Sequence, residues 1–404
     1  PLRPGNFAAF DLHGHIRSWA HGQMTRTYLD NAATTPMAPE VLEAMLPFMR
    51  EHHGNPSAIH SFGRTTRAGV EQARRTVARL LNCAPGEIIF TSGGTEADNM
   101  AIFGSVRDLG VEHVITSPIE HHAVEYVAQA LERDGRAGVH WLRLHADGQP
   151  DLDHLEELLK AHPKALVSLM HANNEIGTRI DLQAIGALCR KYGALFHSDT
   201  VQTMGHYRFD LQSLPVDFIT CAAHKFHGPK GVGFLYMRNG ATLRPMILGG
   251  SQERNMRAGT ENVYGIVGLA KAMELAYDGL EEHQQHVSGL KQYMRKRLSE
   301  LVPGLSFNGD TSENSLYTVL NVHFPEDGRS EMLIYNMDIE GIACSGGSAC
   351  SSGSNKGSHV IGHLHPGRDG ANVRFSFSRY TTRADVDRAL AVVARVYAPV
   401  AVKA

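Results

Sequence analysis

Cysteine is scarce in this chain of 404 residues: five cysteines are scattered along it, and no two form a CxxC pair. So sparse and odd a set argues against the disulfide framework of a small secreted domain and against a structural zinc site. The chain also lacks any apolar run approaching the roughly 20 residues that cross a bilayer. A formal charge of −3 provides no electrostatic attraction for nucleic acid or an anionic membrane. The composition therefore predicts a soluble, cytoplasmic protein.

Histidine, by contrast, is abundant at 24 residues, but its arrangement does not favour a metal. The doublets His52-His53 and His121-His122 direct neighbouring side chains apart, which is poor for chelation, and no HExxH motif occurs. We therefore expect no catalytic metal.

The length suits two domains. Residues 1–27 have neither the apolar region nor the cleavage site of a secretory signal. We predict that they are an added or upstream extension without fixed structure, with a native start at Met24 and a short targeting arm as the alternative. Residues 28–45 are predicted to pack with a small domain, 46–284 to form a large domain, and 285–404 to form the small C-terminal domain.

Short apolar runs alternate with helical stretches between about residues 70 and 240. Strands separated by helices of this length imply βαβ units and a mostly parallel sheet, whose two covered faces explain the continuous apolar runs. The predicted strands span 87–92, 113–117, 139–144, 165–172, 194–199, 217–223 and 231–238, and the predicted helices span 95–109, 121–133, 151–161 and 181–191.

The C-terminal part has the pattern of a smaller α+β domain. Residues 262–301 predict one long amphipathic helical region that could join the two domains. Predicted strands at 317–324 and 372–378 flank a Gly/Ser-rich loop at 344–358. A capping-box pattern opens the last predicted helix at Thr382.

Three motifs place reactive or anion-binding groups directly after predicted strands. Gly94 and Thr95 open a helix whose N–H groups can bind an anion, although an ordinary strand–turn–helix connection fits as well. Lys225 follows a strand where ligands bind in α/β sheets, and an amine held there can form a Schiff base. Asp199 ends another strand and can pair with a protonated pyridine nitrogen, although alone it would read as a helix cap.

Ten segments in chain order carry a resemblance to a known family. From about Tyr28 onward the chain resembles the cysteine desulfurases of the class V aminotransferase superfamily, which are fold-type I pyridoxal-phosphate enzymes. The Gly/Ser-rich loop resembles the longer loop of the housekeeping and nitrogen-fixation type. The segments are YLDNAATTP (28–36), GNPSAIHSFGR (54–64), FTSGGTEADN (90–99), EHHAV (120–124), HANNEIGT (171–178), HSDTVQ (197–202), AHKFHGPKGVG (223–233), GGSQERNMRAGTENV (249–263), SGGSACSSGS (345–354) and NVRFSFSRYT (372–381).

The resemblance implies an α/β fold, with a large domain built on a mostly parallel seven-stranded sheet and a smaller α+β domain. It also implies pyridoxal 5'-phosphate as the cofactor. Lys225 would carry that cofactor and later move protons at the substrate Cα. Asp199 would bind the pyridine nitrogen, Gln202 the ring hydroxyl, and His121 would stack on the ring and act as an acid–base group.

The remaining implied roles concern the phosphate, the substrate and a second subunit. Gly94, Thr95 and His224 would contact the phosphate, and Thr260 would reach the phosphate of a partner subunit, which implies a homodimer. Asn174 and Arg374 would hold the carboxylate of L-cysteine. One departure is Ala222, where relatives often have a phosphate-binding serine, and we expect weaker cofactor retention from it.

A sulfur acceptor must be a mobile, exposed and partly ionised thiol, and Cys350 lies inside the Gly/Ser-rich loop. Cys83, Cys189 and Cys221 fall on helix or strand patterns and are expected in the core, so Cys344 is the rival. The prediction is a desulfurase that makes alanine and a persulfide on Cys350 for acceptor proteins such as an iron–sulfur scaffold.

Two alternatives to the desulfurase stay open. A selenocysteine lyase or another β-lyase could share Lys225 and Asp199, but the placement of Cys350 favours the desulfurase. A non-catalytic subunit of the same fold would be expected to lack one of these three residues, and all three are present.

Overall fold

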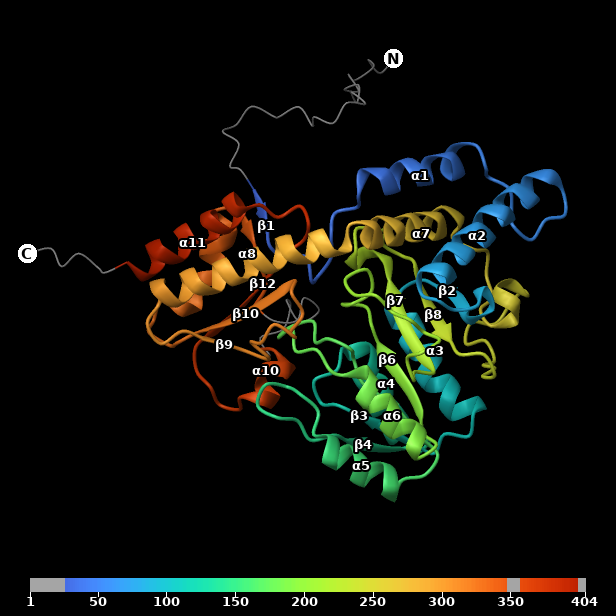
Figure 1. The fold of residues 1–404 in the computed structure, drawn as a ribbon, viewed down its shortest axis with the longest axis horizontal. Helices are drawn as coiled ribbons and strands as arrows, with labels where there is room; N and C mark the ends of the chain where they lie inside the picture. The colour runs from blue at the N-terminus through green and yellow to red at the C-terminus, as the bar shows by residue number, and fades with distance from the viewer. Residues whose placement is uncertain (1–25, 347–356, 399–404) are drawn as a thin grey trace, which may run out of the picture.

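The computed structural model describes residues 26–346 and 357–398, so Cys350 lies outside the described residues. A seven-stranded sheet forms the centre of the larger part of the molecule (Figure 1), with the strand order β2-β8-β7-β6-β5-β3-β4. Strands β7, β6, β5, β3 and β4 are parallel neighbours, and β8 runs antiparallel to both of its neighbours. This confirms the predicted mostly parallel sheet. The strands are β2 (Ile88–Thr91), β3 (His113–Thr116), β4 (Gly138–Trp141), β5 (Ala165–Ser168), β6 (Leu195–Asp199), β7 (Phe218–Ala222) and β8 (Gly233–Met237).

Helices cover both faces of this sheet, which is why its strands are apolar throughout. In β8, Phe234 and Tyr236 join one hydrophobic cluster, whereas Leu235 and Met237 join the cluster on the opposite face. The first cluster involves α1 (Pro39–Arg50), α2 (Ser61–Leu80), α5 (Leu152–Ala161), α6 (Leu182–Lys191) and α7 (Val263–Asp278), and the second involves α3 (Gly94–Asp108) and α4 (His122–Arg133).

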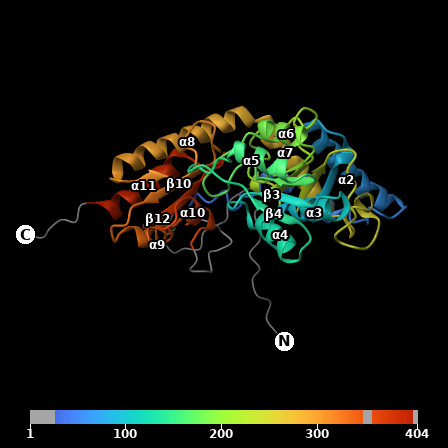
Figure 2. The same cartoon turned by 90° about the horizontal axis from the view of Figure 1, so that it is seen from below.

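A smaller antiparallel sheet, in the order β12-β10-β9, lies beside the large one (Figures 1 and 2). Helices α8, α9 and α11 contribute to a separate hydrophobic cluster with β10 and β12. The elements of this part are α8 (Leu280–Leu301), β9 (Ser306–Phe307), β10 (Val319–Phe324), α9 (Leu333–Ile339), β11 (Ile342–Ala343), α10 (His359–Leu364), β12 (Ala371–Ser376) and α11 (Arg383–Tyr397), and the 3₁₀ turns of the chain are at Pro85–Glu87, Ala223–Lys225, Gln252–Asn255 and Ser330–Met332.

The single helical region predicted for 262–301 is wrong in one respect, because it consists of two helices that meet at Gly279. The side chains of α7 belong to the large core, whereas Val287 and Met294 of α8 belong to the small one. Glycine is a poor helix former, so the helix is interrupted most easily there. The predicted start of the last helix is correct, since Thr382 and Asp385 form a capping box.

Two predicted strands, β4 and β5, end three and four residues earlier than expected. Strand β4 ends at Trp141 because Leu144 bridges to Pro150 and the chain turns back. Strand β5 ends at Ser168, after which Leu169 and His171 still donate to carbonyls of β6 in an irregular extension. That extension leads to a cavity at the carboxyl ends of the parallel strands.

The N-terminal segment contacts both parts of the molecule. Strand β1 (Thr27–Tyr28) pairs in parallel with β11, and Asp30 bridges to β12. Beyond it, Thr35 and Ala38 donate backbone hydrogen bonds to the loop after β7, and α1 packs on α7. Among the described residues, no helix is both long and apolar enough to cross a membrane.

Candidate active site

A cavity of about 240 Å³ lies at the carboxyl ends of β5, β6 and β7, where α/β sheets bind ligands. Its walls also come from the first turns of α3 and α4, from the N-terminal segment and from β12. The cavity brings together nine residues that the sequence nominated, namely Gly94, Thr95, His121, Asn174, Asp199, Gln202, His224, Lys225 and Arg374.

Lys225 ends the 3₁₀ turn that follows β7, so its amine enters the cavity from the sheet edge. The Nζ atom donates to the carbonyl oxygens of Ala32 (2.6 Å) and Ala33 (2.8 Å). The same N-terminal segment holds the neighbouring residue, because Thr35 donates its backbone N–H to the carbonyl of His224 at 2.9 Å. The YLDNAATTP motif thus binds the loop that carries the lysine.

Asp199 is the last residue of β6 and is buried, with Oδ1 accepting from the N–H of Val201 at 2.8 Å. Burial and the nearby carboxyl of Asp98 raise the pKa of Asp199 to about 6, and His121 opposes that rise. Burial disfavours the ionised carboxylate when it stands alone, but a cation beside the carboxylate favours the ionised form. The site therefore suits a ligand with a protonated ring nitrogen.

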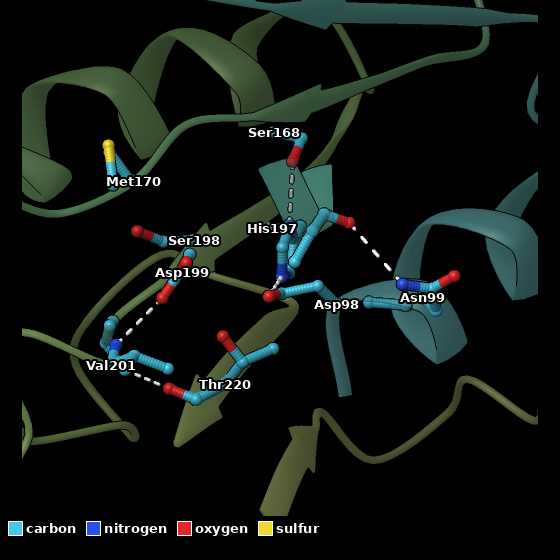
Figure 3. Close-up of polar contacts among 12 residues, drawn as sticks. Asp98, Asn99, Ser168, Met170, His197, Ser198, Asp199, Val201 and Thr220 are labelled. Carbon is cyan, nitrogen blue, oxygen red and sulfur yellow. Dashed lines mark hydrogen bonds and ion pairs between the residues drawn. The ribbon is translucent and has the colours of Figure 1, made fainter. Parts of the chain in front are cut away.

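A buried polar chain lies beneath Asp199 and was missed by the sequence argument. Figure 3 shows His197 between Ser168 and Asp98; its Nδ1 is 2.8 Å from Ser168 Oγ, and its Nε2 is 3.4 Å from Asp98 Oδ1. Burial raises the pKa of Asp98 to about 7 and lowers that of His197 to about 4. Asp98 belongs to the segment FTSGGTEADN, which the family resemblance had already singled out, but nothing in the sequence indicates that it lies near Asp199.

His121 is the N-cap of α4, and its Nδ1 accepts from the N–H of Ala123 at 3.2 Å. An imidazole that accepts at Nδ1 carries its proton on Nε2 when neutral. Burial lowers the pKa of His121, and the positive charge of Lys225 adds to this, whereas Asp199 opposes it. The ring is therefore a neutral donor beside the buried acid. Gln202, also buried, donates its Nε2 to the carbonyl of Ala32 at 3.0 Å.

The N-terminus of α3 supplies the anion-binding end of the cavity. Gly94 begins the helix, and a Cβ on it would lie 2.6 Å from Val201 Cγ2, so the close contact requires glycine. Thr95 follows with its side chain at the cavity wall. Ala222 lines the same wall and has no hydroxyl to donate.

Arg374 provides a positive charge from the middle of β12 and is 1% exposed. Its Nη2 contacts Asp30 Oδ1 at 2.9 Å, and its Nη1 donates to the carbonyl of Asn174 at 2.9 Å. Its buried Nε has no hydrogen-bond partner in the described part of the chain. A planar anion in the cavity would satisfy such a donor, because guanidinium groups match carboxylates in shape.

One described end of the Gly/Ser-rich loop lies beside this arginine, and the other end contacts Glu175. Ser345 exchanges backbone hydrogen bonds with Arg374 (2.7 and 3.2 Å), and Ser358 Oγ donates to Glu175 Oε2 at 2.5 Å. Cys350 lies between these points, outside the described residues, and its role stays a prediction.

The four described cysteines form no disulfide with one another. Cys189 and Cys221 are buried, as predicted, whereas Cys83 lies in the turn after α2 and is only half-buried. Burial raises the pKa of the Cys344 thiol to about 12, which leaves almost no thiolate near neutral pH. Cys344 is therefore poorly suited as a nucleophile.

Thr260 is the one described site candidate that does not line the cavity. It is exposed and lies with Arg257 and Asn262 in a separate pocket. Its predicted contact with a partner subunit stays a prediction.

The chemical groups that line the cavity match the parts of pyridoxal phosphate that a protein must bind. A lysine amine, a buried acid, a neutral imidazole and a glycine-lined helix N-terminus correspond to the aldehyde carbon, ring nitrogen, ring face and phosphate of that group.

Comparison with known proteins places most of the chain in one family. The family described as aminotransferase class-V matches residues 27–389. A protein named cysteine desulfurase IscS from Dictyoglomus turgidum is 43% identical over 373 residues, which cover 91% of this chain and 94% of that protein. The protein of the same name from Clostridium botulinum is 41% identical over 378 residues, covering 92% and 94%.

Solved structures show the same fold. A NifS-like protein superposes with a TM-score of 0.85 at 36% identity, covering 92% of this chain and 99% of that one. A protein described as SspA in complex with cysteine has a TM-score of 0.76 at 32% identity, covering 88% and 100%.

Proposed function

The chain belongs to the class-V aminotransferase family, and we propose that it is a pyridoxal-phosphate-dependent cysteine desulfurase, which converts L-cysteine to L-alanine and a persulfide on Cys350. The observation that carries the proposal is the convergence of Lys225, Asp199 and Arg374 on one cavity. These residues come from two sheets and supply an amine, an acid and a carboxylate-binding fork. The relatives named cysteine desulfurase support the choice of substrate.

The cofactor would be held by Lys225 through its amine, by Asp199 at the ring nitrogen and by Gln202 at the ring hydroxyl. His121 would stack on its ring, while Gly94, Thr95 and His224 would hold its phosphate. When bound, pyridoxal phosphate supplies an electron sink for the carbanion at the substrate Cα.

Arg374 orients the substrate by binding its carboxylate together with Asn174. The ion pair with Asp30 and the bond to the Asn174 carbonyl hold the guanidinium in place before the substrate arrives. An anchor that is already ordered loses little entropy on binding, so it fixes the Cα–H bond toward the lysine side of the cavity at small cost.

Lys225 removes and returns the proton at Cα once its amine is released. The carbonyl oxygens of Ala32 and Ala33 lie within hydrogen-bond distance of Nζ and keep that amine inside the cavity. His121 is a neutral donor at Nε2 and assists proton transfer to the groups that leave the substrate.

The Cys350 thiolate would attack the substrate Sγ, and the Cβ–Sγ bond would break as the S–S bond of the persulfide forms. The electron pair of the broken bond would stay with the carbon fragment, and a proton taken up at Cβ would complete the methyl group of alanine. The chain length between Ser345 and Cys350 supports this assignment, because five residues span up to about 17 Å from a point beside Arg374. The high pKa of Cys344 argues against the rival.

A homodimer follows if Thr260 reaches the phosphate of a second copy, which agrees with its exposure outside the cavity. The persulfide would then pass to an acceptor protein such as an iron–sulfur scaffold. The absence of a disulfide among the described cysteines agrees with a reducing compartment, and we place the protein in the cytoplasm.

The test is the release of alanine and sulfide from L-cysteine in the presence of a reducing thiol. The intact protein should release both in equal amounts, and Cys350→Ala should lose sulfide release while it still binds cofactor. Cys344→Ala is the matched control and should stay active. If Cys350→Ala keeps full activity, direct β-elimination becomes the better assignment, and a parallel assay with selenocysteine separates desulfurase from selenocysteine lyase.

A further inference from the structure

Two histidines and a glutamate converge just outside the cavity, at the start of two helices. His122 is the first residue of α4, Glu125 lies one turn later, and His359 is the first residue of α10. Glu125 Oε2 is 3.8 Å from His122 Nε2 and 3.7 Å from His359 Nε2. The elements are more than 200 residues apart in sequence, so only the fold creates this cluster.

Glu125 provides an independent sign that the cluster is incomplete. Its Oε1 accepts from Gln129 Nε2 at 2.9 Å, but its Oε2 is enclosed and has no hydrogen-bond partner among the residues that the structure describes. An enclosed carboxylate oxygen without a donor costs free energy unless something satisfies it. The two imidazole nitrogens are too far away for hydrogen bonds, but they surround the same point.

We propose that His122, Glu125 and His359 bind a divalent transition-metal ion, with zinc as the best match. Two imidazoles and a carboxylate are ligands that zinc accepts, and tetrahedral bonds of about 2.1 Å place ligand atoms roughly 3.4 Å apart. The two distances from Glu125 Oε2 need to close by only a few tenths of an ångström, and all three ligand atoms lie within 4.8 Å of one another. The side chains are 22%, 16% and 27% exposed, so an ion can enter and keep a water as a fourth ligand.

The packing around the cluster limits the rearrangement that binding requires. The His122 ring stacks on Tyr126, with centroids 4.6 Å apart and planes 8° from parallel. His359 Nε2 donates to the Glu120 carbonyl at 3.0 Å, and a metal would replace this hydrogen bond. The competing arrangement is therefore a purely structural one, in which His359 keeps its bond to Glu120.

A second group of histidines serves as the internal comparison. His113, His140 and His162 also bring their ring nitrogens together, at the far end of the sheet. The rings of His140 and His162 stack at 3.6 Å and 17°, His140 Nε2 is already hydrogen-bonded to His113 Nδ1 at 3.2 Å, and the group contains no carboxylate. We therefore assign the metal to the cluster that includes Glu125.

The bound metal would join two elements that border the reaction centre. His122 directly follows His121, and His359 directly follows Ser358, the described end of the Gly/Ser-rich loop. The ion would hold these helix starts together, in a site separate from the cofactor and the substrate. This proposal does not depend on the activity proposed above.

The test is metal binding by the full-length, cofactor-loaded protein after chelator treatment, using zinc in calorimetry and cobalt in visible spectroscopy. We expect one zinc per chain bound at this cluster, and a cobalt ligand-field band typical of nitrogen and oxygen ligands. Glu125→Gln keeps the size of the side chain and should weaken zinc at least tenfold. His140→Ala, in the other histidine group, should leave this site unchanged.

Two further readouts separate binding from folding. Zinc should raise the unfolding temperature of the intact protein and of His140→Ala, but not that of Glu125→Gln, because ligand binding stabilises only a folded site. Unchanged cofactor absorbance in Glu125→Gln would show that the variant is folded. The proposal is overturned if no zinc binds stoichiometrically, or if binding survives Glu125→Gln and is lost in His140→Ala.

Discussion

The two sheets supply the same cavity in different ways. The seven-stranded sheet contributes residues at or just beyond its strand ends, such as Asp199 after β6 and Lys225 after β7. The three-stranded sheet contributes Arg374 from the middle of a strand, where the residue pairs in register with Asn321. Parallel strands end together at one edge, so their termini form a site directly. An antiparallel strand must point a side chain out of its face.

The two sheets also differ in the charged groups that they bring to the cavity. The part of the molecule built on the large sheet places the buried carboxyl groups of Asp199 and Asp98 in the cavity wall and that of Glu120 behind it. Burial raises the pKa of Asp199 to about 6, of Asp98 to about 7 and of Glu120 to about 8. The small sheet places a buried arginine opposite them, paired with Asp30. The carboxyl groups of the large part therefore favour the binding of a cationic ring, and the arginine of the small part favours the binding of an anionic substrate.

Replacing the lysine of the large sheet should have the largest effect. Lys225→Ala should lower alanine formation by about 10⁴-fold or more, because the variant lacks both the covalent anchor and the base. The visible absorption of the cofactor should also disappear after dialysis. Lys230→Ala, an exposed lysine of the same motif, is the control and should retain activity. Substantial turnover by the Lys225 variant would contradict the assigned role.

The buried acids should make the cofactor-free protein less stable as pH rises. Their folded pKa values lie above the usual ones, so their contribution is complete below about pH 4 and is lost progressively up to about pH 8. Asp98→Asn imitates the protonated acid and should match the intact protein most closely near or below pH 4, where the carboxyl is still largely protonated in both the folded and the unfolded chain. Near pH 8 the variant should be more stable, on the order of a few kcal/mol.

Urea unfolding at several pH values measures this effect. A loss of stability in Asp98→Asn at both pH values would instead show a charged Asp98 paired with a protonated His197. Adding cofactor should reduce the pH dependence, since a ring cation beside Asp199 favours its carboxylate.

Arg374→Lys tests the contribution of the small sheet. Lysine keeps the charge but cannot form the bidentate fork, so KM for L-cysteine should rise by roughly 10- to 100-fold with a smaller change in kcat. Steady-state kinetics check this, and cofactor absorbance should stay unchanged because the large sheet is intact. Equal losses of cofactor and activity would mean that Arg374 supports the fold and not the substrate.

Ala222→Ser should give the smallest effect and in the opposite direction. A hydroxyl at this wall of the cavity would add one donor to a charged phosphate, which is worth about 1.5 kcal/mol and thus roughly tenfold in cofactor affinity. Cofactor release under dilution measures the change. An unchanged release rate would show that Ala222 does not limit cofactor retention.

The fold was predictable where pattern follows local chemistry. Seven apolar runs became seven strands, and the capping box at Thr382 began a helix as expected. The errors occurred where tertiary packing decides the outcome. Gly279 breaks the helical region because the chain leaves one core for the other, and β4 ends early because Leu144 turns back to Pro150.

The residues of the site were likewise only partly predictable from the sequence pattern. Strand-end position indicated Lys225 and Asp199 from the pattern alone, since neighbouring parallel strands end at a shared edge. Arg374 and Asn174 came only from the family resemblance, because a mid-strand arginine carries no local signal of its partners. Asp98 was missed, since the carboxylate that it approaches lies about 100 residues away.

Local patterns along the chain were enough to predict the period of each element, the caps, the glycine at the anion-binding turn and the residue types available at the strand ends. These depend on interactions within a few residues. Which distant groups meet became known from the folded chain alone: the amine of Lys225 contacts the carbonyls of Ala32 and Ala33, and Arg374 contacts Asp30. Such contacts join chain segments about 190 to 340 residues apart, and packing of the whole fold, not local preference, fixes their geometry.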